Sequence, residues 1–238
     1  MNWQTDWRDT PCWILNFNNL DRGFRDLLLW LRRAGMTKVA VLDNASTYQP
    51  LIDFYDSPAM AGITLVRSPE NLGFEAMWKL GLHLPPITPA GSRYILSDPD
   101  VVPDKNCPLD LVRKMHEVAD RYAPAKVGPA LRIDNLHPSQ AEHTQRCESD
   151  YWLRRVGSDC WDALIDTTFA LYSSKWERWP QEAPHYARHL RLDFPYVAEH
   201  RPWYEDAAEP SAETCFYRAH VAPGFSTAYP VPVPEVAR

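Results

Sequence analysis

The stretch Tyr94-Ile-Leu-Ser-Asp98-Pro-Asp100-Val-Val-Pro103 decides how the rest of the sequence is interpreted. Its first three residues form a short apolar run that is typical of a buried strand. One proline separates the two aspartates and another follows, so a helix is excluded and the backbone is held extended. Asp98 and Asp100 are therefore expected to leave a sheet edge as hard oxygen ligands, which suit Mg²⁺ or Mn²⁺ carrying a diphosphate. The alternative is a simple turn after a strand, because aspartate and proline both favour turns.

The composition is that of an ordinary globular protein. The 238 residues are 45% hydrophobic and 24% charged, which predicts a soluble protein with a sizeable core. No apolar run approaches the roughly 20 residues of a membrane span, so an integral membrane protein is not expected.

The N-terminus lacks the basic and apolar regions of a signal peptide. The five cysteines are scattered and form no C-x-x-C pair, which favours reduced thiols in a cytoplasmic protein. A net charge of −6 argues against broad binding to a nucleic-acid backbone.

Apolar runs and helical spacing alternate along the part of the chain that precedes Tyr94. Strands are predicted at Pro11–Asn18, Lys38–Leu42 and Ile63–Val66, and helices at Asp21–Arg33, about Gln49–Tyr55 and Glu75–Leu82. Asp21 is the candidate N-cap of the first helix, and Gly35 ends it. This alternation is the pattern of a parallel sheet with right-handed crossovers, in which ligands bind outside the carboxyl ends of the strands.

Polar clusters follow each of these strands. Asn16, Asn18 and Asn19 close the first strand, and Asp43 closes the second, where it could accept hydrogen bonds from a base or a ribose. Asn44 and Ser46 could instead cap the next turn. Neither G-x-G-x-x-G nor G-x-x-x-x-G-K-[ST] occurs, so a bound nucleotide must be held by side chains and a metal ion.

Four motifs in sequence resemble those of the GT-A glycosyltransferases, in particular the family 2-like group. They are Ile14–Asn18, Val41–Ser46, Glu70–Phe74 and, in the place of that family's D-x-D motif, Ile95–Val102. The resemblance covers roughly the first 104 residues. It implies an α/β fold of the GT-A type, with a mostly parallel central sheet flanked by helices.

The resemblance also implies a nucleotide-sugar donor, with a UDP-sugar as first choice. Asp43 would lie near the base, Asp98 on the ribose or the metal, and Asp100 on the metal. The donor-binding set is completed by polar and glycine positions of the other motifs, namely Asn16, Asn18, Asn71 and Gly73. The chain is then one domain, with residues 1–104 binding the donor and 105–238 binding the acceptor and ending in an extended proline-rich tail.

The second half supplies the candidate base. An inverting transfer needs a carboxylate that takes the proton of the acceptor hydroxyl. Tyr204-Glu205-Asp206 loosely matches the acidic element that many GT-A enzymes carry late in the chain, so Asp206 is the first choice and Glu205 the second. Asp166 stands where many relatives have small residues, and it is either an acceptor contact, a catalytic carboxylate or a cap of the predicted strand Asp162–Tyr172.

Aromatic and histidine residues lie near Glu205 and Asp206 in the sequence. Trp203 could stack on an acceptor sugar or base, and His200 or His220 could complete the metal site. The Q-x-x-R-W element of the family is absent, and this puts processive polymer synthesis in doubt.

The sequence therefore predicts a metal-dependent, inverting and non-processive glycosyltransferase. The rivals are a nucleotidyltransferase acting on a sugar phosphate and a non-catalytic nucleotide-sugar-binding module. A saccharide, a lipid-linked glycan, a protein side chain, a small metabolite and a modified nucleobase all remain open as acceptor.

Overall fold

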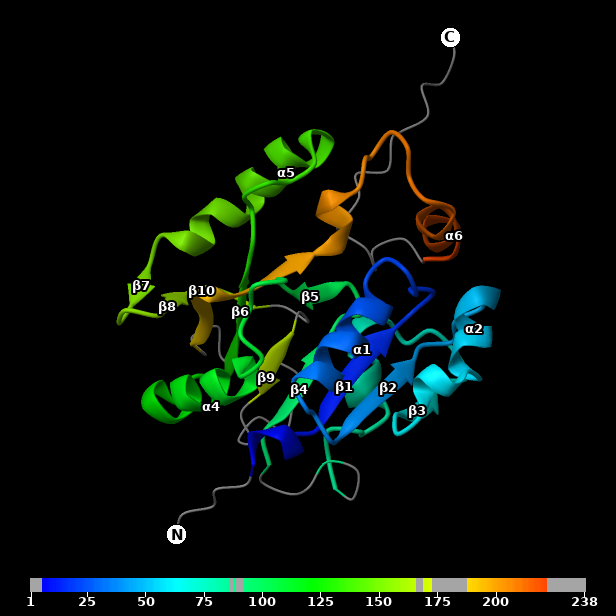
Figure 1. Ribbon diagram of the computed structural model, residues 1–238, viewed down its shortest axis with the longest axis horizontal. Coiled ribbons are helices and arrows are strands. Elements are labelled where there is room, and N and C mark those ends of the chain that lie inside the picture. Colours follow the sequence, from blue (N-terminus) through cyan, green and yellow to red (C-terminus); the bar gives the residue numbers. More distant parts are fainter. Residues whose placement is uncertain (1–5, 86–87, 89–91, 166–168, 173–187, 222–238) are drawn as a thin grey trace.

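The computed structural model describes residues 6–85, 88, 92–165, 169–172 and 188–221 (Figure 1). Its centre is one sheet with the strand order β3-β2-β1-β4-β9-β6-β10-β8-β7, and β5 pairs with β10 beside this path. The predicted α/β class, a central sheet flanked by helices, is confirmed. None of the helices in the described residues is long and apolar enough to span a membrane.

The N-terminal part of the sheet is parallel. Its strands are β1 (Cys12–Asn16), β2 (Val39–Asp43), β3 (Thr64–Arg67) and β4 (Tyr94–Ser97). The connections carry α1 (Phe24–Arg33), α2 (Gln49–Tyr55), the 3-10 turns η2 (Pro58–Met60) and η3 (Gly73–Glu75), and α3 (Ala76–Lys79). The predicted alternation of strand and helix is confirmed for this part of the chain.

The C-terminal part mixes parallel and antiparallel pairs. Antiparallel pairing enters at β9, while β6 and β10 are parallel to each other. The elements after β4 are β5 (Val101–Pro103), α4 (Leu111–Tyr122), β6 (Lys126–Leu131), α5 (Pro138–Glu148), η4 (Ser149–Trp152), β7 (Arg155–Val156), β8 (Cys160–Asp162), β9 (Ala170–Tyr172), β10 (His189–His200), η5 (Arg201–Tyr204) and α6 (Ala212–His220). A further 3-10 turn, η1 (Trp7–Asp9), precedes β1.

Both faces of β1 are buried, which explains its continuous apolar run. Cys12 and Ile14 join the core that α1, α2 and α4 cover, whereas Trp13 and Leu15 join a second core with Met77 of α3. Successive strand residues point to opposite faces, so one run of five residues serves both layers.

Three predicted boundaries are wrong, and one of them is the end of the third helix, which stops at Lys79 rather than Leu82. The first helix begins at Phe24 rather than Asp21, and Gly23 is its N-cap without a side-chain hydrogen bond. The reason is tertiary, because the backbone N–H groups of Leu20, Asp21 and Arg22 are bound by Glu213. The predicted strand Asp162–Tyr172 contains only the last residue of β8 and then the whole of β9.

Candidate active site

The carboxyl ends of β1 and β2 form a closed polar network. Asn16 and Asp43 are register partners in these neighbouring strands. The Tyr55 hydroxyl joins them, because it accepts from Asn16 Nδ2 at 3.1 Å and donates to Asp43 Oδ1 at 3.2 Å. Arg67 Nε donates to Asp43 Oδ2 at 3.3 Å. Burial, together with the charge of Asp43, raises the pKa of Tyr55, so the hydroxyl keeps its proton. The fully buried Asp43 carboxylate is thus held on both oxygens.

Asn18 connects the loops after β1 and β2. Its φ of 50° lies in the left-handed region that asparagine tolerates. Its Oδ1 accepts from the backbone N–H groups of Thr47 at 2.7 Å and Tyr48 at 3.0 Å, and its own N–H donates to Ser46 Oγ at 2.9 Å. Asn18 therefore fixes the shape of both loops from a buried position.

The loop after β3 is folded onto the end of β2. Asn44 Oδ1 accepts from the Leu72 N–H at 2.8 Å, and Asn44 Nδ2 donates to Asn71 Oδ1 at 2.7 Å. Asn71 Oδ1 also accepts from the Gly73 N–H at 2.9 Å. Gly73 has a φ of 69°, which glycine adopts without strain. The predicted donor-binding residues Asn71 and Gly73 are thus brought to the same edge of the sheet as Asp43.

The Asp98-Pro99-Asp100 segment is the turn between β4 and β5. Gly23 packs directly against it. A Cβ atom on Gly23 would lie 2.6 Å from Asp100 Cα and 2.8 Å from the Pro99 carbonyl oxygen, and the residue has a φ of 153°. Only glycine fits this position, so the loop after β1 and the aspartate turn are held in close contact.

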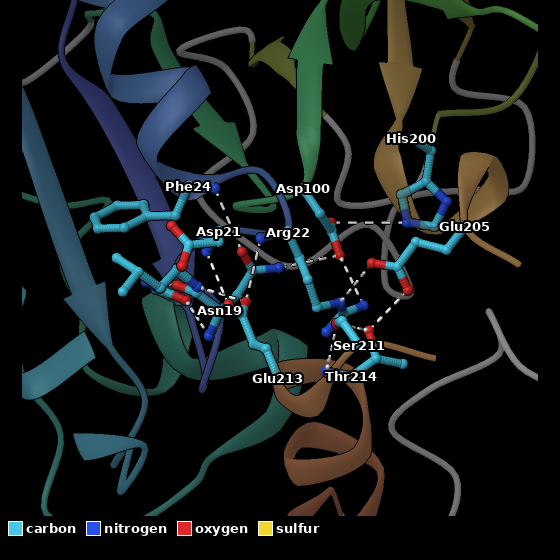
Figure 2. Close-up of polar contacts among 12 residues, drawn as sticks. Asn19, Asp21, Arg22, Phe24, Asp100, His200, Glu205, Ser211, Glu213 and Thr214 are labelled. Atoms are coloured by element: carbon cyan, nitrogen blue, oxygen red, sulfur yellow. Dashed lines mark hydrogen bonds and ion pairs between the residues drawn. The ribbon is translucent and has the colours of Figure 1, made fainter. Parts of the chain in front are cut away.

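Asp100 lies near two other ionisable side chains, His200 and Arg22, and Arg22 in turn lies near Glu205; we call these four residues the Asp100 cluster (Figure 2). Asp100 Oδ1 lies 3.7 Å from His200 Nε2, and Oδ2 lies 3.8 Å from Arg22 Nη2. Arg22 Nε in turn lies 3.9 Å from Glu205 Oε1. β5 pairs antiparallel with the end of β10, opposing Val101 to His200, and this pairing brings His200 to the turn.

A second carboxylate, Glu213, organises the loop that carries Arg22. Its oxygens accept from the backbone N–H groups of Leu20 at 2.7 Å, Asp21 at 2.8 Å and Arg22 at 3.3 Å. Glu213 lies in the first turn of α6, and Figure 2 shows it below the loop. Sequence reasoning missed both Arg22 and Glu213, because each resembles an ordinary surface charge on a helix or a loop.

The donor atoms fit a divalent cation only in part. An aspartate oxygen and an imidazole nitrogen face each other in the Asp100 cluster, and among the residues that the structure describes His200 Nδ1 is buried without a hydrogen-bond partner. Carboxylates and imidazole are suitable ligands for Mn²⁺. However, no group of three or more His, Cys, Asp or Glu side chains in the described residues is arranged to hold a metal ion. The metal site formed by Asp98, Asp100 and His200 therefore stays a prediction.

The other predicted residues lie in different surroundings. Asp206 Oδ1 is 3.9 Å from His137 Nδ1 and accepts from the Ala208 N–H at 3.0 Å, so these contacts tie it to the segment around α5 rather than to the Asp100 cluster. The His220 ring stacks on Phe216, 3.9 Å between centroids. Trp203 packs edge-on against His200 at 4.7 Å. Asp166 and the predicted proline-rich tail lie outside the described residues.

Comparison with known proteins gives structural likenesses alone. No protein-family model and no curated protein matches the sequence. S. aureus TarS 1–349 is 11% identical with a TM-score of 0.48, covering 82% of this chain and 60% of that chain. GalNAc-T7 with UDP, GalNAc and Mn²⁺ is 11% identical with a TM-score of 0.49, covering 81% and 43%. HddC from Yersinia pseudotuberculosis, complexed with GMP-PN, is 14% identical with a TM-score of 0.46, covering 79% and 91%. This chain thus spans less than two thirds of the first two structures, and matches at this identity compare chain paths, not site residues.

Proposed function

We propose that the protein is a glycosyltransferase that moves a sugar from a nucleotide-sugar donor, a UDP-sugar as first choice, to an acceptor hydroxyl. The observation that carries the proposal is the contact of Asp100 with His200 and Arg22, and of Arg22 with Glu205, beside the carboxyl ends of β1 and β4. Ligands of open α/β sheets bind outside the carboxyl ends of the parallel strands. A carboxylate turn with a nearby imidazole and guanidinium at that edge suits a diphosphate and its cation.

The nucleoside would be bound at the ends of β1 and β2. Asp43, kept in position by Tyr55 and Arg67, is proposed to read the base or the ribose. Asn16, Asn18, Asn71 and Gly73 are proposed to hold the surrounding loops in the shape that the donor requires. A preformed network of this kind reduces the ordering cost of binding.

The diphosphate would be bound at the aspartate turn. Asp98, Asp100 and His200 are the residues that would hold Mn²⁺ or Mg²⁺. When bound there, such an ion would neutralise the charge that develops on the leaving diphosphate. His200 would present Nε2 to this site, since that nitrogen faces Asp100.

Glu205 is proposed as the base of an inverting, non-processive transfer. The acceptor oxygen would attack the anomeric carbon, the bond from that carbon to the diphosphate oxygen would break, and the hydroxyl proton would pass to the carboxylate. Glu205 is favoured over Asp206 by its link to Asp100 through Arg22. Thr214 Oγ1 donates to Glu205 Oε2 at 2.7 Å and would orient it. Asp166 stays a further candidate.

The two halves are proposed to form one domain. β9, β6 and β10 continue the sheet that begins with β3, β2, β1 and β4, so the donor half and the acceptor half share one core. All five cysteines are free thiols, and this supports a reducing compartment such as the cytoplasm.

The test is a titration of the protein with Mn²⁺ and a panel of nucleotide sugars, followed by heat-unfolding protection and donor hydrolysis. The wild type is expected to be protected by UDP with Mn²⁺, and Asp100→Ala is expected to lose both protection and hydrolysis. Asp120→Ala removes an acid that is 72% exposed and is the matched control. Absence of any nucleotide-sugar binding contradicts the proposal. Turnover of a nucleoside triphosphate with a sugar phosphate would indicate a nucleotidyltransferase, and protection without turnover a binding module.

A further inference from the structure

The Arg22 side chain is a buried cation at the centre of the site. It is only 3% exposed, whereas the Asp100 and Glu205 side chains that it faces are 15% and 26% exposed. The guanidinium also lies over the Tyr217 ring, 4.7 Å from its centroid. Arg22 thus lies beneath the two carboxylates, which are the groups that reach solvent.

This one guanidinium joins four segments, which come from the first, the middle and the last part of the described chain. Arg22 follows β1, Asp100 follows β4, Glu205 follows η5 and Tyr217 belongs to α6. Its backbone is anchored by Glu213, so the guanidinium is not carried by a free loop. A buried charge is tolerated where opposite charges compensate it, and the aspartate and the glutamate supply that compensation.

The distances indicate attraction between charges rather than direct hydrogen bonds. The contacts of Arg22 with Asp100 and Glu205 are 3.8 and 3.9 Å, beyond the usual hydrogen-bond range. A divalent cation bound to Asp100 would lie within a few ångströms of the guanidinium. Like charges at such a distance repel each other, and screening is weak where one of them is buried.

We propose that Arg22 is a positioning residue with two opposing effects on this site. It holds Glu205 next to Asp100, and its charge lowers the affinity of Asp100 for a bare divalent cation. A cation that arrives together with an anionic diphosphate does not meet the same net repulsion, so Arg22 favours the metal–nucleotide complex over the metal alone. The inference rests on the proposed function and adds a selectivity to it.

The first experiment measures Mn²⁺ affinity without any turnover, by the electron paramagnetic resonance signal of free Mn²⁺. Arg22→Gln is expected to bind bare Mn²⁺ roughly fivefold more tightly than the wild type, because the repelling charge is gone. It is expected to bind Mn²⁺ with UDP no better than the wild type does. Arg25→Met is the control, because Arg25 is 49% exposed and pairs with Asp21. If Arg22→Gln does not fold, Arg22→Met gives the same measurement, because the thioether can still pack on the Tyr217 ring.

The second experiment separates charge from geometry. Arg22→Lys retains the charge but loses the two-pronged guanidinium. The Mn²⁺ affinity of this variant is expected to stay within about twofold of the wild type. Its kcat is expected to fall roughly tenfold, because Glu205 is no longer held in place, while KM for the donor changes little. A merely structural role would lower metal affinity, kcat and stability together.

The outcomes separate this inference from the proposed function. If the wild type binds Mn²⁺ with UDP but folded Arg22→Gln binds bare Mn²⁺ no more tightly, the inference is wrong and the proposed function stands. If the wild type binds neither Mn²⁺ nor UDP in the presence of Mn²⁺, the proposed function is wrong and the inference falls with it.

Discussion

The two ends of the site are built in opposite ways. At the ends of β1 and β2, the Asp43 carboxylate is fully buried and hydrogen-bonded through both oxygens to Tyr55 and Arg67. In the Asp100 cluster, by contrast, the ion pairs between the charged groups are 3.7 to 3.9 Å long and partly open to solvent. The first end is a completed network, whereas the second is a set of charges held near one another at distances longer than a hydrogen bond.

This difference separates the residues that build the site from those that are available for chemistry. A side chain whose hydrogen bonds are satisfied inside the protein contributes mainly to stability and shape. The Asp100 and Glu205 carboxylates are partly exposed, so a ligand that arrives from solvent can contact them directly. Substitutions at the first end should therefore change stability and the affinity for the donor's nucleoside, and those at the second end should change metal binding and turnover.

The largest effect is expected from Glu205→Gln in the Asp100 cluster. Glutamine can still accept the Thr214 hydrogen bond, but it cannot take a proton from an acceptor hydroxyl. Transfer should fall by about 100-fold or more, which is the usual contribution of a general base, while donor binding stays within about threefold. Single-turnover kinetics with a measured donor affinity checks this. A variant that transfers sugar at the wild-type rate would exclude Glu205 as the base.

Gly23→Ala tests whether the aspartate turn must lie where it does. The added methyl would lie 2.6 Å from Asp100 Cα, so the turn has to move. A displacement of this size near reacting groups is expected to lower donor hydrolysis by roughly 100-fold. Gly62→Ala is the matched control, because Gly62 also has a positive φ of 77° but has nothing within 4 Å of the place that its methyl would occupy. Equal losses in both variants would mean that backbone strain, not contact with Asp100, is the cause.

Tyr55→Phe tests the closed end of the site. The change removes the hydroxyl between Asn16 and Asp43 and leaves a buried carboxylate with one partner fewer. The free energy of unfolding should fall by about 2 kcal/mol, measured by urea denaturation, with little change in Mn²⁺ affinity. Tyr48→Phe is the control, since the contact of that ring with Phe216 survives the change. A loss of Mn²⁺ affinity without loss of stability would reverse the contrast between the two ends.

The parallel part of the fold could be predicted because its signals are local. Each strand from β1 to β4 is an apolar run that ends in a polar cluster, and the intervening helices show regular spacing. The start of α1 could not be predicted, because the backbone donors of Asp21 and its neighbours are bound by Glu213, which is 192 residues from Asp21. β10 could not be predicted as a strand either, since Arg191, Asp193 and Glu199 interrupt its apolar pattern. Its partners β5, β6 and β8 hold Arg191 and Glu199 in the sheet, and the Asp193 N–H donates to the Asp159 carbonyl oxygen at 2.9 Å.

The site could be predicted where a motif carries it. The position of Asp98 and Asp100 between a strand and prolines identifies them, and the candidate His200 is brought to Asp100 by the pairing of β5 with β10. No sequence motif identifies Arg22 as a site residue, because it is one of several arginines around α1. Its role depends on burial, and burial follows from the contacts of α6 with the loop after β1 (Figure 1).

The smallest effect is expected from Asp206→Asn, and it is the sharpest test of the contrast between neighbouring carboxylates. Asp206 is 40% exposed, and its contact with His137 is a surface pair at 3.9 Å, which contributes less than about 1 kcal/mol. Asparagine retains the acceptor for the Ala208 N–H. Transfer should therefore change by less than about twofold, against the large loss in Glu205→Gln. If Asp206→Asn loses transfer while Glu205→Gln retains it, Asp206 is the base. The segment around Glu205 must then rearrange when the acceptor binds, because Asp206 has to reach the reacting hydroxyl from its position beside α5.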